Sequence, residues 1–265
     1  MRTDWFDYEF RFAGRTDTGK MRSENQDEVI LAPGEGLFAV SDGMGGVACG
    51  GQSSKYVQEA MPLMVKGYVH GTNGEKEEIG GRLSDSIRMM SERLFAQGNS
   101  AGWIQYGATA AGFVFHRDSA VFFCLGDSRG YILPRYGRDL VQVTNDMNVA
   151  GLLVRGGEMT KEEAKGSPAS SQLTAFVGMA GEAEPETIVV PVKPGDRLLV
   201  CSDGLYGMVP EKEIASIMRS SRRESQVVER LIARANEAGG RDNISAVVVR
   251  IVRDARGNRR QRRKG

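Results

Sequence analysis

Residues 37–46 read LFAVSDGMGG, a short apolar run that ends on Asp42 and is followed by glycines. The same arrangement returns at residues 198–204, LLVCSDG, where the run ends on Asp203. Short apolar runs bounded by glycine are typical of buried β-strands. Each run therefore predicts a strand that carries an aspartate to its end.

Two further aspartates have comparable positions. In the stretch FFCLGDSR at residues 122–129, Asp127 follows the apolar run. Asp242 stands in GGRDNI, just before an apolar run at residues 244–252. A single Asp-Gly pair usually marks a turn. Four carboxylates at strand ends in one chain predict a site at which several strands converge.

Carboxylates are the ligands that Mg²⁺ and Mn²⁺ prefer, and neighbouring glycines let backbone carbonyls approach an ion closely. Two such ions about 3.5–4 Å apart can share a carboxylate and a water molecule, whose pKa they lower. The chain has only two histidines, His70 and His116, which argues against a histidine-rich zinc site or a histidine-based catalytic triad.

The order of the remaining patterns predicts one α+β domain. Strand-like runs occupy residues 28–31, 37–41, 109–115, 120–125, 130–133, 140–143, 187–192, 197–202 and 244–252. Helical patterns occupy residues 57–65, where Pro62 should kink or restart the helix, and residues 83–94, 211–219 and 224–238. Thr160 and Glu163 predict a capping box on one short helix. Consecutive strands with short links favour antiparallel sheets covered by helices.

The composition suits a single domain over residues 1–252. The chain has 265 residues, 40% of them hydrophobic, with no apolar run near the roughly 18 residues that span a membrane. The mixed charges of the first residues do not resemble a signal peptide. Cys49, Cys124 and Cys201 form an odd set without CxxC spacing, which predicts buried thiols and a cytoplasmic location.

The charge is unevenly distributed. Residues 253–265 hold seven basic residues and one acid, a net charge of +6, whereas the whole chain carries +1. This basic segment has no large apolar residue and is expected to be a disordered tail. The remaining residues are acidic by about 5 charges, so we expect no nucleic-acid partner for the domain.

These residues resemble the metal-dependent protein phosphatases of the PPM type, the phosphatase-2C class. The matching motifs, in family order over about residues 11–252, are RSENQD at 22–27, DGMGG at 42–46, GAT at 107–109, GDSR at 126–129, SDG at 202–204 and GRDN at 240–243. The methionine in DGMGG resembles the bacterial branch. The resemblance implies a four-layer αββα sandwich, with two antiparallel sheets flanked by helix pairs. It also implies a monomer that acts on phosphoserine and phosphothreonine in proteins phosphorylated by a Ser/Thr kinase.

The resemblance further implies a ligand set for Mn²⁺ or Mg²⁺. Asp42 would bridge two core ions, and the carbonyl of Gly43 would bind one of them. Asp203 and Asp242 would hold the other ion, and Asp127 would bind a third, weaker ion together with Asp203. A hydroxide that bridges the core ions would attack the phosphorus in line.

Two more residues have implied roles near the metals. Arg22 would grip the substrate phosphate as a planar donor fork, and Asp27 would orient metal-bound water. Simpler alternatives exist for single residues: Arg22 as a surface ion-pair residue, and Asp127 as the cap of a turn with Arg129 paired to it.

The chain departs from the family pattern at several positions. Gln26 replaces a frequent glutamate, and Met44 stands where animal relatives have histidine. Residues 144–148, TNDMN, lack the usual Asp-His-Ser, and the flap segment 151–172 is atypical. These differences bear on substrate preference more than on metal binding.

Three other functions remain open on the sequence alone. The enzyme could be dedicated to one regulatory phosphoprotein, because such an enzyme would share every metal ligand. It could be a pseudophosphatase that binds phosphoproteins without turnover, although none of the three core aspartates is missing. It could also be an unrelated two-metal hydrolase such as a nuclease, against which the acidic domain argues.

Overall fold

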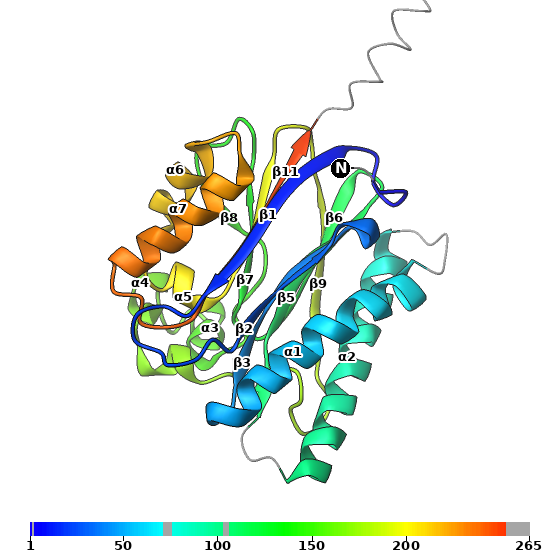
Figure 1. The fold of residues 1–265 in the computed structure, drawn as a ribbon, viewed down its shortest axis with the longest axis vertical. Coiled ribbons are helices and arrows are strands. Elements are labelled where there is room, and N and C mark those ends of the chain that lie inside the picture. The colour runs from blue at the N-terminus through cyan, green and yellow to red at the C-terminus, as the bar shows by residue number, and fades with distance from the viewer. Residues whose placement is uncertain (2, 71–75, 103–105, 253–265) are drawn as a thin grey trace, which may run out of the picture.

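A computed structural model describes residues 1, 3–70, 76–102 and 106–252 (Figure 1). The tail at residues 253–265, and with it the expected disorder, lies outside the described residues.

The described chain forms two antiparallel sheets. One sheet has the order β1 (Glu9–Asp17), β11 (Ile244–Val252), β10 (Arg197–Cys201), β7 (Arg129–Leu133) and β8 (Val141–Gln142). The other has the order β2 (Asp27–Ala32), β3 (Leu37–Met44), β5 (Ala110–His116), β6 (Ser119–Leu125) and β9 (Glu186–Pro191), with β4 (Gly107–Ala108) paired to β3.

The two sheets enclose an aromatic core between them. On β5, Phe113 and Phe115 belong to the cluster between the sheets, whereas Val114 belongs to the cluster beneath the helices. On β3, Phe38 points into the same inner cluster, and its ring lies 5.6 Å from that of Phe113. Because side chains alternate along a strand, a strand that is buried on both faces supports two apolar layers.

Each outer face of the sandwich is covered by a pair of helices (Figure 1). The helices α1 (Gly46–Met64) and α2 (Lys76–Ala101), joined in part by the π-helical turn Val65–Val69, pack on the β2–β9 sheet. The helices α6 (Glu211–Arg219) and α7 (Glu224–Glu237) lie over the other sheet. The predicted stripe of α2 is confirmed, since its four apolar side chains are fully buried: Leu83, Ile87, Met90 and Leu94.

The α+β prediction and the predicted four-layer αββα sandwich are therefore confirmed. None of the helices in the described residues combines the length and hydropathy that a membrane crossing requires. Between β8 and β9 the chain forms three short helical segments: α3 (Val149–Arg155), α4 (Lys161–Ala164) and the 3₁₀ turn Pro168–Ser171. A short helix α5 (Asp203–Tyr206) follows β10.

The helix does not restart at Pro62, which was one of the two outcomes expected there. The helix α1 runs through Pro62 to Met64, and the irregular π-helical turn begins only at Val65. Proline removes one backbone donor and usually breaks a helix. Here Met61 and Val65 are both fully buried, so the apolar face continues on either side of the proline and its packing keeps the helix intact.

Local turn signals were more reliable. Arg117 and Asp118 connect β5 to β6 in a tight turn, with His116 paired to Ser119 and Arg117 in the left-handed region at φ 52°. The capping box of Thr160 and Glu163 is also present. By contrast, the strand β1 and the helix α3 were not predicted. Only part of β1 is buried, because it is an edge strand, and its apolar pattern is correspondingly weak.

Candidate active site

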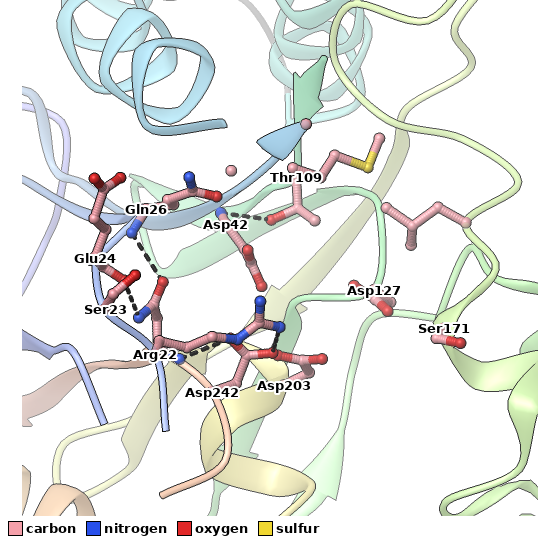
Figure 2. Close-up of a pocket in the computed structure, with 15 residues that line it drawn as sticks. Arg22, Ser23, Glu24, Gln26, Asp42, Thr109, Asp127, Ser171, Asp203 and Asp242 are labelled. Atoms are coloured by element: carbon pink, nitrogen blue, oxygen red, sulfur yellow. Dashed lines mark hydrogen bonds and ion pairs between the residues drawn. The ribbon is translucent and has the colours of Figure 1, made fainter. Parts of the chain in front are cut away.

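One cavity of about 390 Å³ collects the charged residues that the sequence singled out (Figure 2). Its lining includes Arg22, Asp42, Asp127, Asp203 and Asp242. These residues come from five separate segments of the chain. The structure therefore brings four predicted carboxylates and the predicted phosphate-binding arginine to one place.

The strand pair β2 and β3 positions two of the aspartates. Asp27 and Asp42 are direct partners in the register of these antiparallel strands. The backbone of Asp42 is also held by Thr109, whose hydroxyl accepts its N–H at 3.0 Å and whose own N–H donates to its carbonyl at 2.8 Å. Burial, together with the nearby charges of Asp27 and Asp203, raises the pKa of Asp42 well above its usual range.

Gly43 allows the end of β3 to lie against the start of α1. Its N–H donates to the Gln26 carbonyl at 3.0 Å, and an added Cβ would lie 2.1 Å from the Gly50 carbonyl oxygen. A side chain at position 43 would force the strand away from the helix. The glycine after Asp42 is therefore a packing requirement as well as a predicted ligand.

Asp203 lines the cavity beside one sheet, whereas Asp27, on the other sheet, is buried and is not among the residues that line it. Burial raises the pKa of Asp203 to about 8, and the charge of Asp127 adds to that shift. Burial also raises the pKa of Asp27 to about 6, although the Ser202 hydroxyl donates to its Oδ2 at 2.7 Å. The Oδ1 atoms of Asp27 and Asp203 are buried and have no hydrogen-bond partner among the residues that the structure describes. Unpaired carboxylate oxygens of this kind need a cation or a water molecule.

Arg22 supplies positive charge to this cluster. Its Nη2 lies 2.8 Å from Asp242 Oδ2, and that contact raises the pKa of the guanidinium group. Among the described residues, no three aspartate, glutamate, histidine or cysteine side chains already surround a single point. The four aspartates instead line the cavity as a set of oxygen donors, and such an all-oxygen set fits Mg²⁺ or Mn²⁺.

Asn243 holds the loop that carries Arg22, a role that the sequence reasoning missed. Its Oδ1 accepts the Gln26 N–H at 2.8 Å, and its Nδ2 donates to the carbonyls of Thr18 at 2.9 Å and Glu24 at 2.8 Å. The residue is buried and directly follows Asp242. The only sequence signal was its place in the GRDN motif.

The surroundings of Asp127 correct one alternative. Arg129 does not pair with Asp127: its Nη2 lies 2.6 Å from Asp146 Oδ2, and its guanidinium group stacks on Tyr206 at 3.7 Å from the ring centroid. Asp127 instead accepts a hydrogen bond of 3.3 Å from Asn148 Nδ2, and burial raises its pKa to about 6. Asn148 also donates to the Ser170 carbonyl at 2.9 Å, so it links this carboxylate to the flap segment.

Comparisons with known proteins show the family of this chain. The family model described as protein phosphatase 2C matches residues 20–248. The serine/threonine phosphatase Stp of Listeria monocytogenes is 33% identical over 240 residues, which cover 89% of this chain and 93% of that protein. The crystal structure of the Mycobacterium tuberculosis serine/threonine phosphatase PstP/Ppp is 30% identical, with a TM-score of 0.80, and covers 92% of this chain and 99% of that one. A structure of the PstP catalytic domain in complex with two manganese ions has a TM-score of 0.77, at 29% identity and with 92% and 98% coverage. This chain therefore belongs to the protein phosphatase 2C family.

Proposed function

We propose that this serine/threonine protein phosphatase holds two Mn²⁺ or Mg²⁺ ions with Asp42, the Gly43 carbonyl, Asp203 and Asp242. A third, weaker ion would lie between Asp127 and Asp203. When bound, such ions neutralise the negative charge of the phosphate and generate a nucleophile from water near neutral pH. The observation that carries the proposal is the convergence of four aspartates on one cavity, where the buried Oδ1 of Asp203 has no hydrogen-bond partner among the described residues.

The residues of the chain have distinct tasks in this scheme. Arg22 lies at the cavity with its side chain 58% exposed, so it can present its planar donor fork to a phosphate that arrives from solvent. Its contact with Asp242 keeps that fork beside the proposed ligands. Asp27, held by Ser202 in the buried wall, would accept a hydrogen bond from water at the site and so orient it.

The substrates are proteins that carry phosphoserine or phosphothreonine, and we propose that a Ser/Thr kinase supplies them. Met44 and Leu173 also line the cavity, so it offers apolar surface beside the carboxylates. Met44 cannot exchange a proton, and protonation of the leaving oxygen must come from another group or from water.

We further propose one catalytic domain over residues 1–252, a monomeric state and a cytoplasmic location. The free thiols of Cys49, Cys124 and Cys201 support that location.

The decisive experiment is hydrolysis of a phosphothreonine peptide with EDTA, Mg²⁺ or Mn²⁺, by the native chain and by Asp203→Asn. This change keeps the shape of the side chain and removes its charge. We expect turnover to require the metal and to fall at least about a hundredfold in Asp203→Asn, because a core ligand is lost. The matched control is Asp139→Asn on the exposed β7–β8 hairpin, which should leave turnover unchanged.

Two outcomes would contradict the proposal. Full activity of a folded Asp203→Asn variant would remove Asp203 from the metal site. Tight binding of the phosphopeptide by the metal-loaded native chain without any turnover would instead favour the pseudophosphatase alternative.

A further inference from the structure

Three strands separate the active-site cavity from a second charged region of the molecule. The strand β7 begins two residues after Asp127, β10 ends two residues before Asp203, and β11 begins two residues after Asp242. Since five-residue strands such as β7 and β10 span roughly 16 Å, the loops at their other ends lie well away from the carboxylates. Figure 1 shows these loops gathered at the end of the molecule where β11 finishes.

These loops are rich in exposed cations. We call the surface that they form the basic end: the hairpin at residues 134–139, the turn at residues 193–196 and the segment at residues 219–230. Seven of its basic side chains are exposed: Arg135, Arg138, Lys193, Arg219, Arg222, Arg223 and Arg230. The same loops expose only two acids, Asp139 and Glu229.

Contacts between the loops show that the basic end is one surface. Arg219 Nη2 donates to the Gly137 carbonyl at 2.6 Å, which ties the helix α6 to the hairpin. Arg230 Nη1 donates to the Ser220 hydroxyl at 2.8 Å. The turn approaches the hairpin as well, because a Cβ on Gly195 would lie 2.4 Å from the Arg135 side chain.

The positive charge of the basic end is not neutralised within the described part of the chain. None of its seven exposed cations takes part in an ion pair there. The buried acids nearby are already hydrogen-bonded or paired: Asp196 accepts the backbone N–H groups of Arg135 at 2.9 Å and Lys193 at 2.8 Å, and Glu224 pairs with Arg250 at 2.5 Å. The surface therefore has positive charge available to an anionic partner.

An exposed aromatic residue stands among these cations. Tyr136 is 87% exposed on the hairpin, and the guanidinium group of Arg135 lies 4.9 Å from its ring centroid. A tyrosine beside basic residues is typical of protein surfaces at the lipid headgroup level. A surface formed by the ends of several loops also suits a planar partner, such as a bilayer, better than an extended peptide.

The last described strand also ends at this surface. Arg250 Nη2 donates to the Arg222 carbonyl at 2.9 Å, so the end of β11 lies beside the basic end. The residues that follow Val252, at 253–265, contribute seven more basic residues in the sequence. Clusters of this size bind anionic membrane surfaces electrostatically.

We propose that the basic end docks on a bilayer that contains anionic phospholipids, with the active-site cavity turned away from the membrane. Docking of this kind would concentrate the phosphatase near phosphoproteins at the membrane without blocking their access to Asp42 and Asp203. Each basic residue near an anionic surface changes partitioning by roughly fivefold. The proposal does not depend on the metal assignments.

The experiment is co-sedimentation of the full chain with phosphatidylcholine vesicles and with vesicles in which about one lipid in three is phosphatidylglycerol. We expect binding only to the anionic vesicles at about 50 mM salt, and loss of binding at about 500 mM salt. Arg222→Gln combined with Arg223→Gln should reduce the partition coefficient about tenfold or more. The matched control, Lys55→Gln with Arg93→Gln on the helices α1 and α2, removes the same charge elsewhere and should bind at least three to five times better than the basic-end variant.

Turnover of a soluble phosphopeptide is measured on every variant and should stay unchanged, which separates this proposal from the proposed function. Native-like vesicle binding by the Arg222→Gln, Arg223→Gln variant would overturn the proposal. So would complete loss of binding on removal of residues 253–265 if the basic-end variant still binds, because the tail alone would then be responsible. Binding to a DNA or RNA duplex without binding to anionic vesicles would overturn it in favour of a nucleic-acid partner.

Discussion

Asp203 shows how the residues of the site depend on one another. It lies at the start of α5, immediately after the buried strand β10, and one of its oxygens is buried without a hydrogen-bond partner. Asp27 and Asp127 add negative charge to the same small volume. Without cations, mutual repulsion and burial favour protonated carboxyl groups.

The first prediction concerns the stability of metal-free protein at different pH values. The pKa values of Asp27 and Asp127 are raised to about 6, and that of Asp203 to about 8. In the unfolded chain these groups lose their protons near pH 4. Between these values the folded state binds more protons, so its free energy of unfolding falls as the pH rises.

We therefore expect the Tm in EDTA to fall by more than about 5 °C between pH 5.5 and pH 8, measured by differential scanning fluorimetry. Asp203→Asn should flatten this dependence and raise the Tm at pH 8. Addition of Mn²⁺ should raise the Tm of the native chain most strongly at high pH, where the carboxylates are charged. A Tm in EDTA that rises over this range would refute the interpretation.

A second prediction at the residue scale concerns Asn243. Its side chain holds three backbone groups of the loop at residues 18–26, so Asn243→Ala should release Arg22 from its position. We expect KM for a phosphopeptide to rise about tenfold, with a smaller change in kcat, because a phosphate contact loses its preorganisation. Steady-state kinetics at saturating Mn²⁺ test this expectation.

The control for Asn243 is Asn25→Ala, which removes an exposed hydrogen bond to Thr16 at 2.8 Å and a longer one from the Asp27 N–H at 3.2 Å, and should raise KM less than Asn243→Ala does. If Asn243→Ala lowers both kcat and Tm but leaves KM unchanged, Asn243 only stabilises the fold.

At the scale of elements, the junction of β3 and α1 determines where Asp42 lies. The strand and the helix meet at Gly43 and Gly50, where a Cβ on Gly50 would lie 2.9 Å from the Gly43 carbonyl oxygen. Two glycines are needed because backbone lies against backbone at this point. The predicted metal ligand at Gly43 thus belongs to a tightly packed junction of the site.

Gly43→Ala should lower the free energy of unfolding by at least about 2 kcal/mol, because the new Cβ would meet the Gly50 carbonyl. Urea denaturation in EDTA measures this change independently of the metal. Gly51→Ala, one position further along α1, has no atom nearer than 3.9 Å and should be neutral or stabilising by up to about 1 kcal/mol. Equal stabilities of the two variants would contradict the packing argument.

The elements themselves differed in how well the sequence predicted them. The central strands and the stripe of α2 were predicted because their apolar periodicity is complete. The edge strand β1 and the short helix α3 were not, since only Ala150 of α3 is buried and the pattern is too sparse to recognise. The continuation of α1 through Pro62 required knowledge of the sheet against which Met61 and Val65 pack.

At the scale of the whole molecule, the antiparallel strands give the sandwich two functionally different ends. The end of β11 lies beside the basic end, because Arg250 Nη2 donates to the Arg222 carbonyl at 2.9 Å. The active-site cavity lies at the opposite ends of β7, β10 and β11. One end thus carries clustered aspartates, and the other carries unpaired arginines.

The sequence by itself determined the strand-forming runs, the aspartates at their ends and the membership of the family, because apolar periodicity and short motifs are local properties. Only the tertiary structure decided that Arg22 contacts Asp242 across 220 positions of the chain, that Arg129 pairs with Asp146 and that Asn243 holds the arginine loop. The physical reason is that such contacts depend on how the sheets stack and which loops meet at their ends. Local patterns place each residue on its strand, whereas packing between distant segments chooses its partners.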